Sequence, residues 1–285
     1  MSGGLVPLPV PPPRLPQGVS RVLTETARAA SDALAQSWAQ FERSELAEIV
    51  RVGADGTDTF RLDDAVEAAI IETAGAHGVN VLSEEHGFID GGHAATLVID
   101  PLDGSANAVA GVPLSCFSAA LYVDGRAVEA LNLWLENGWT QWARRDGEGL
   151  RTAGGAAPVL ASGARSLRTA AVDLLRPKRH ADGDSTAAWI RVSEACARVR
   201  VLSTTCLESM LVASGAIDAF ADPGSQTHRL VDLAAASLIV PAAGGAVIDA
   251  FGAPLEFDTD LTRRWSGVIA ATEELAEELA VVIRG

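Results

Sequence analysis

The stretch LVIDPLDGSANAVAGVP (Leu97–Pro113) joins a short apolar run to two aspartates, Asp100 and Asp103. A buried charge is costly unless it is paired or binds a cation, so acids that close an apolar strand need a partner. The proline between them restricts the backbone and Gly104 permits a tight turn, so both carboxylates can face one ion with the Leu102 carbonyl oxygen between them. The stretch therefore favours a cation site at the end of a buried strand.

Two more groups of acids stand at the ends of expected elements. Glu84 and Glu85 follow the apolar run Val79–Leu82, and Asp232 begins the helix-patterned stretch VDLAAASLIVPAAGG in the second half of the chain. Any one of these acids alone is better explained as a solvated turn or helix-cap residue. Together they predict a site for Mg²⁺, which takes carboxylate, carbonyl and water oxygens.

The spacing excludes two other acidic motifs. An EF-hand loop needs oxygen ligands at positions 1, 3 and 5 and glycine at position 6, whereas counting from Asp100 places Leu102 at position 3 and Gly104 at position 5. A phosphatase with a nucleophilic aspartate typically carries the pattern DxDx[TV], in which the two acids are two residues apart. Asp100 and Asp103 are three apart, so that class is disfavoured.

Composition limits the partners. The 285 residues carry a net charge of −15, which argues against nucleic acids and anionic membranes because both need clustered lysine and arginine. A small phosphorylated substrate is compatible with this charge, because bound cations or helix N-termini reverse the field inside one pocket. Three widely spaced cysteines, Cys116, Cys196 and Cys206, fit neither a disulfide framework nor a zinc knuckle, so we expect reduced thiols and a cytoplasmic protein.

The periodicity predicts three regions and a mixed fold class. Residues 1–18 are too proline-rich for a signal peptide and too short to span a membrane, and we expect a mobile arm. Residues 19–152 form an α+β half, with helical spacing first and then strands, two of which meet at the hairpin signal Asn137–Gly138. Residues 153–285 alternate strand and helix, which is typical of an α/β half, and the boundary lies near residues 149–158.

The chain resembles a known family through three motifs in the right order and spacing. SEE (83–85), IDPLDGSANAVAGVP (99–113) and VDLAAASLIVPAAGGAVID (231–249) resemble the signature set of the inositol monophosphatase-like family of Mg²⁺-dependent, Li⁺-sensitive phosphomonoesterases, which includes fructose-1,6-bisphosphatases. GADGTDTFRLDDAVE (53–67) is most similar to the archaeal-type branch with both inositol-phosphate and fructose-bisphosphate activity. The resemblance spans residues 19–285 and implies a layered αβαβα sandwich and a homodimer.

The resemblance also implies roles for individual residues. It implies two or three Mg²⁺ ions, with Glu85 assisting a weaker ion. The implied ligands are Glu84, Glu85, Asp100, the Leu102 carbonyl, Asp103 and Asp232. The implied catalytic residues are Asp63, Glu84 and Ser105, with Asp63 paired to the Ser105 hydroxyl to orient or deprotonate the attacking water. The expected substrate contacts are Asp103, Gly104, Ser105, Ala106, Thr204, Asp222 and Asp232.

The chemistry of such a site is coherent by itself. Two cations about 4 Å apart can hold a water on one side of a phosphate and the leaving alkoxide on the other. The backbone N–H groups of Gly104, Ser105 and Ala106, at the start of a short helical turn, can receive the phosphate oxygens. No lysine or arginine is then needed for the phosphate.

Several positions depart from the family pattern. Ser105 stands where threonine is usual. RVLSTTCLES (200–209) replaces the small residues that line the sugar or cyclitol side of the pocket in the family, so this stretch leaves the identity of the substrate open. Arg229 and Arg176 could meet a second phosphate, although exposed, solvated arginines are expected. His86 is expected to be a structural or surface residue.

The sequence thus predicts a Mg²⁺-dependent phosphomonoesterase that acts on inositol monophosphate, fructose 1,6-bisphosphate or both, through a metal-activated water. Histidinol-phosphate and 3′-phosphoadenosine-phosphate phosphatases are alternatives, but they usually carry lysine where this chain has Ala106. A specialised cyclitol or sugar phosphatase and a non-catalytic sugar-phosphate-binding protein also remain open.

Overall fold

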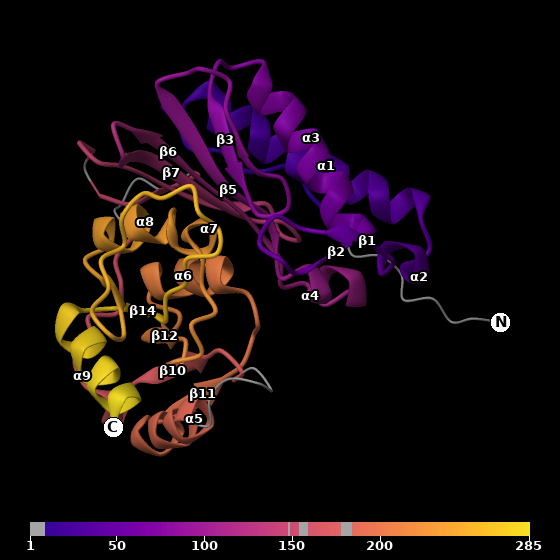
Figure 1. The fold of residues 1–285 in the computed structure, drawn as a ribbon. Coiled ribbons are helices and arrows are strands. Elements are labelled where there is room, and N and C mark those ends of the chain that lie inside the picture. The colour runs from indigo at the N-terminus through magenta and orange to yellow at the C-terminus, as the bar shows by residue number, and fades with distance from the viewer. Residues whose placement is uncertain (1–8, 148, 154–158, 178–183) are drawn as a thin grey trace.

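A computed structural model describes residues 9–147, 149–153, 159–177 and 184–285. Five layers follow one another: helices, a large sheet, helices, a smaller sheet and helices (Figure 1). This is the αβαβα sandwich that the family resemblance implied, and the expected fold class is confirmed.

The first layer consists of α1 (Arg21–Gln40) and α3 (Arg61–Gly75), which pack against each other and cover one face of the large sheet (Figure 1). Apolar residues three and four apart form the buried stripe of α1, including Leu23, Ala27, Ala30 and Leu34. Three small elements lie between these helices in the chain: α2 (Arg43–Leu46) and the two-stranded hairpin of β1 (Ile49–Val52) and β2 (Asp58–Phe60).

The large sheet has the strand order β4-β3-β5-β6-β7-β8-β9. Its strands are β3 (Asn80–Ser83), β4 (Gly87–Ile89), β5 (Ala95–Asp103), β6 (Cys116–Val123), β7 (Arg126–Trp134), β8 (Trp139–Arg144) and β9 (Arg151–Thr152). Only β3 and β5 are paired in parallel among these described strands, so these two neighbours end at the same edge of the sheet. The short helix α4 (Ser105–Ala110) follows β5 directly.

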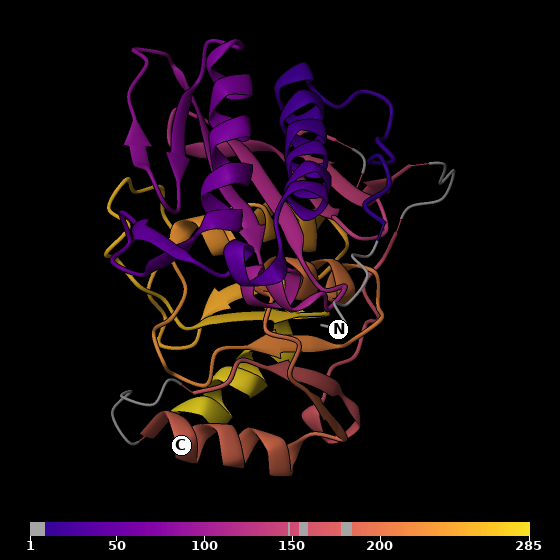
Figure 2. The same ribbon diagram turned by 90° about the vertical axis from the view of Figure 1, so that its right-hand side faces the viewer.

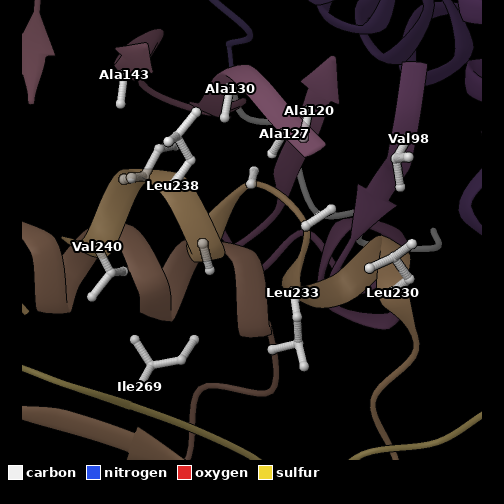
Figure 3. Packing of buried hydrophobic residues seen from close by; sticks show 14 of the residues in the cluster. Val98, Ala120, Ala127, Ala130, Ala143, Leu230, Leu233, Leu238, Val240 and Ile269 are labelled. Carbon is white, nitrogen blue, oxygen red and sulfur yellow. The ribbon is translucent and has the colours of Figure 1, made fainter. Parts of the chain in front are cut away.

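The middle layer consists of α6 (Thr205–Ala213), α7 (Leu230–Leu233) and α8 (Ala236–Ala242). Figure 3 shows Leu230, Leu233 and Leu238 of this layer beside Ala120 and Ala130 of the large sheet. The helix-patterned stretch VDLAAASLIVPAAGG forms two helices, α7 and α8, which places the first-turn residue Asp232 on a separate short element.

The smaller sheet has the order β11-β10-β12-β14-β13, and two helices cover its outer face (Figure 2). Its strands are β10 (Ala171–Leu174), β11 (Arg198–Arg200), β12 (Ala219–Ala221), β13 (Ala246–Asp249) and β14 (Gly267–Ala270). The outer helices are α5 (Asp184–Ala195) and α9 (Glu273–Arg284), and the 3₁₀ turn η1 (Leu167–Thr169) precedes β10.

The expected mobile arm is wrong for its described part. Residues 1–8 lie outside the described residues, but residues 9–18 pack on the first half of the protein. The Arg14 N–H donates to the Gly138 carbonyl oxygen at 2.8 Å, and Val10 and Leu15 pack against the core beneath α1. The expected boundary at 149–158 falls partly on residues outside the described ranges.

Candidate active site

The acids that end β3 and β5 lie side by side. Ser83 is opposite Ile99 in the parallel pair, so Glu84 and Asp100 follow at equivalent places on adjacent strands. Asp100 is only 1% exposed, and its Oδ1 has no hydrogen-bond partner among the described residues. A buried carboxylate oxygen without a partner is costly, and a bound cation would remove that cost.

A β-bulge brings Asp103 to the same place as Asp100. Asp100 is opposite Ser118 and Asp103 is opposite Cys116, so β5 has one more residue than β6 over this interval. Side chains three residues apart on a regular strand point to opposite faces, and one extra residue restores a common direction. As a result, ligand atoms of Asp100, Asp103 and Cys206 lie within 4.8 Å of one another.

The second half of the chain holds Asp103 in position. Asp103 Oδ2 accepts hydrogen bonds from Thr204 Oγ1 at 2.8 Å and from the Cys206 N–H, at the start of α6, at 2.5 Å. Thr204 was expected to contact the substrate, but its buried hydroxyl is engaged by Asp103. It therefore acts through this carboxylate.

Gly104 allows the chain to leave β5 and begin α4. Its φ is 85°, in the left-handed region, and a Cβ there would lie 2.6 Å from the Leu114 carbonyl oxygen, so only glycine fits. The Asn107 side chain fixes α4 by donating to the carbonyl oxygens of Leu114 and Leu202, at 3.0 and 2.9 Å. Ser105 is half-buried and Ala106 is exposed, so the first turn of α4 is accessible to a ligand.

Glu85 lies in the turn between β3 and β4, and its side chain reaches the hairpin of β1 and β2. Its Oε2 accepts a hydrogen bond from the Thr59 hydroxyl, and a Cβ on Gly53 would lie 2.2 Å from that oxygen. Arg51 donates to the Glu85 carbonyl oxygen at 2.7 Å and pairs with Glu67, so it fixes the turn after β3.

Asp63 is buried in the first turn of α3, where it accepts a hydrogen bond from the Phe60 N–H at 3.2 Å. No hydrogen bond joins it to Ser105, although both residues are described, so the expected pairing is not formed directly. Burial, together with the charges of Glu84 and Glu85, raises the pKa of Asp63 to about 8. A carboxylate with such a pKa is a suitable proton acceptor near neutral pH.

Arg229 lies inside the acidic cluster, and the expectation of an exposed arginine is wrong. Its side chain is 12% exposed and forms ion pairs with Asp232, Asp55 and Glu84. Asp55 was not predicted as a site residue. The position of Arg229 three residues before Asp232, at the start of a helix, was the only sequence signal for their pairing.

The electrostatics of the cluster separate its acids into two groups. Burial raises the pKa of Glu84 and of Asp103 to about 7, and it raises the pKa of Asp100 well above its usual value. Burial opposes ionisation of Asp232 too, but the Arg229 guanidinium overcomes this effect and holds its pKa below the usual value. The site therefore holds more carboxylate than one arginine neutralises, and its oxygen donors fit a hard divalent cation.

Three remaining side chains have structural or surface positions. Asp222, expected to contact the substrate, is fully buried, and its two oxygens accept from the N–H groups of Ser225 and Thr227 at 2.6 and 2.8 Å. These hydrogen bonds hold the loop that follows β12. His86 lies 2.7 Å from Glu67 and Arg176 is exposed, as expected for both.

The layered fold and its oxygen-lined acidic site define an α/β phosphatase. The Inositol monophosphatase family model matches residues 16–284, so the chain belongs to this family and is a phosphoric monoester hydrolase. No helix in the described ranges is both long and apolar enough to cross a bilayer.

Known relatives agree with this assignment. The chain is 33% identical over 250 residues to a fructose-1,6-bisphosphatase/inositol-1-monophosphatase of Methanothermobacter thermautotrophicus, covering 81% of this chain and 85% of the relative. It is 31% identical over 199 residues to a histidinol-phosphatase of Mycobacterium tuberculosis, covering 67% and 74%. A solved structure from Pyrococcus horikoshii, titled as similar to inositol-1 monophosphatase, superimposes with a TM-score of 0.75 at 25% identity, covering 92% and 96% of the two chains.

Proposed function

We propose that this enzyme is a Mg²⁺-dependent phosphatase of inositol monophosphate, fructose 1,6-bisphosphate or both, and that water attacks phosphorus directly. The observation that carries the metal assignment is the β5 bulge, which brings Asp100, with its unpartnered buried oxygen, to Asp103 beside the end of β3. The Mg²⁺ ligands in this proposal are Glu84, Asp100, the Leu102 carbonyl, Asp103 and Asp232. When bound, Mg²⁺ activates water and neutralises charge on the phosphate.

The chain's own groups bind the phosphate and accept the proton. The N–H groups of Gly104, Ser105 and Ala106 point from the first turn of a helix and receive phosphate oxygens. In this proposal Asp63 and the Ser105 hydroxyl act together on the attacking water, which they orient or deprotonate. The pKa of Asp63, raised to about 8 by burial, supports this role.

The substrate assignment rests on the relatives and on one difference from other branches. Several relatives with good coverage carry both fructose-1,6-bisphosphatase and inositol-1-monophosphatase in their names. The histidinol-phosphatase relative supports histidinol phosphate as the second candidate. Ala106, in place of the lysine usual in that branch, favours the sugar or cyclitol substrate.

The test is phosphate release from inositol 1-phosphate, fructose 1,6-bisphosphate, histidinol phosphate and 3′-phosphoadenosine 5′-phosphate, each with Mg²⁺ and with EDTA. We expect metal-dependent release from one or both of the first two. Faster release from histidinol phosphate would overturn the substrate assignment. Release that is equal in EDTA would overturn the metal dependence.

Ser105→Ala should lower kcat by about 100-fold or more, because a positioned proton-transfer group typically contributes about 100- to 10,000-fold. KM should change little, since the phosphate contacts of the backbone N–H groups remain. Steady-state kinetics on the preferred substrate measures both constants. The matched control is Ser105→Thr, which keeps the hydroxyl and should retain kcat within a few-fold. An unchanged kcat in the alanine variant would exclude the hydroxyl from the proton path.

The compartment, assembly and organisation belong to the same proposal. Free Cys116 and Cys206 are buried side chains, which fits a reduced, cytoplasmic protein.

We place the two halves of the chain at residues 19–152 and 153–285, and the active enzyme is a homodimer. Light scattering during gel filtration tests the assembly, and a single monomeric mass at assay concentration would contradict it.

A further inference from the structure

Arg229 has more bonds to the acidic cluster than a surface arginine could make. Its Nε and Nη2 donate to the two oxygens of Asp232 at 3.0 and 2.9 Å, a bidentate pair. Its Nη1 donates to Asp55 Oδ2 at 2.5 Å and to Glu84 Oε1. One guanidinium thus joins acids from the loop after β1, the end of β3 and the first turn of α7.

The guanidinium is a permanent positive charge in this place. Arginine stays protonated at all physiological pH values, and the Arg229 side chain, which is 12% exposed, forms ion pairs with Asp55, Glu84 and Asp232. The main chain holds the residue too, because the Arg229 N–H donates to Asp232 Oδ2 at 2.5 Å. Breaking the buried ion pair between Arg229 and Asp232 would leave carboxylates without a compensating charge, so the Arg229 side chain is expected to stay in the site.

The remaining acids of the cluster are free of this cation. Asp103 is held only by the neutral donors of Thr204 and Cys206, and Asp100 Oδ1 has no partner among the described residues. The cluster therefore divides into a side already neutralised by Arg229 and a side that still needs positive charge.

We infer that Arg229 takes the place of one metal ion beside Glu84 and Asp55, so that this chain binds two Mg²⁺ ions per site instead of three. The inference rests on the proposed metal dependence and deepens it. Arg229 is a positioning residue here: it holds the Glu84 and Asp232 carboxylates in the arrangement that the two ions need, and it supplies a charge that a third ion would otherwise bring.

The number of bound ions tests the inference directly. Equilibrium dialysis against Mg²⁺ should give two ions per chain for the wild type, three for Arg229→Met, and two for Arg229→Lys, which keeps the charge. Arg264→Met is the matched control, because Arg264 contacts only the main-chain oxygen of Asp55 in this region, at 3.2 Å, and it should leave the count at two. Three ions in the wild type, or an unchanged count in Arg229→Met, would overturn the inference.

Thermal unfolding in EDTA gives a second readout. Arg229→Met should lower the Tm by at least about 5 °C, because buried Asp55 and Asp232 and half-buried Glu84 lose their cation, and Mg²⁺ should add more to its stability than to that of the wild type. The Tm of Arg229→Lys in EDTA should lie between that of Arg229→Met and that of the wild type. If Arg229→Met does not fold without Mg²⁺, the ion count is taken on protein purified and kept in Mg²⁺: three ions per chain would support the inference, and two would overturn it. A wild type that binds no Mg²⁺ would instead refute the proposed function.

Discussion

Asp103→Asn is expected to lower kcat/KM for the preferred substrate by at least about 100-fold, equivalent to about 3 kcal/mol of transition-state stabilisation. The substitution removes one ligand charge at the place where the β5 bulge brings two carboxylates together. The fold should persist, because the amide oxygen can still accept the hydrogen bonds of Thr204 and Cys206. Steady-state phosphate release and thermal unfolding measure the two effects separately.

Asp64→Asn is the matched control for this variant. Asp64 is a nearby, 43% exposed acid that pairs with Arg51 at 2.8 Å and does not reach the cluster. Its loss removes the same charge from the same half of the protein, and we expect kcat/KM within about threefold of the wild type. Wild-type turnover in Asp103→Asn would remove Asp103 from the metal site, and equal losses in both variants would point to a general charge effect.

The metal-free protein should lose stability as the pH rises from about 4 to about 8. Burial raises the pKa of Glu84 and Asp103 to about 7 and that of Asp63 to about 8 in the folded protein, whereas in the unfolded chain these groups titrate near pH 4. Between these values the folded state binds more protons than the unfolded state, so the free energy of unfolding falls with increasing pH. Asp232, with its pKa lowered, contributes the opposite slope only below about pH 4.

Thermal unfolding at pH 5, 6, 7 and 8 in EDTA and in excess Mg²⁺ checks this expectation. The Tm should fall across the series in EDTA, and the fall should be much smaller in Mg²⁺, because bound cations favour the ionised carboxylates. Asp63→Asn should flatten the part of the EDTA curve nearest pH 8. A Tm in EDTA that rises between pH 5 and pH 8 would contradict the raised pKa values.

The sequence predicted the elements that carry the site because their signals are local. Apolar runs that end in acids, as at Glu84 and Asp100, correctly placed β3 and the buried part of β5. A proline and a glycine around Asp103 also indicated the turn into α4. Periodicity therefore predicted these helices and strands and the location of the acidic cluster, whereas the layered arrangement was implied by the family resemblance.

The features that the sequence did not reveal depend on contacts between distant segments. Arg229 and Asp55 are 174 residues apart, and neither lies in a motif that requires the other. The bulge in β5 is defined only by its register against β6. Asp222 was expected to contact the substrate, but both of its carboxylate oxygens accept hydrogen bonds from N–H groups of the following loop. Pairing partners of this kind follow from tertiary structure.

The bulge between Asp100 and Asp103 also limits how this segment can change over evolutionary time. Deleting one residue there would restore the regular alternation of the strand and remove or displace the Leu102 carbonyl between the two aspartates, while both carboxylates would still be chemically intact. Replacing Leu102 by another apolar residue would leave the alternation as it is. Descendants of this gene should therefore accumulate changes of residue type at this point far more readily than changes of length.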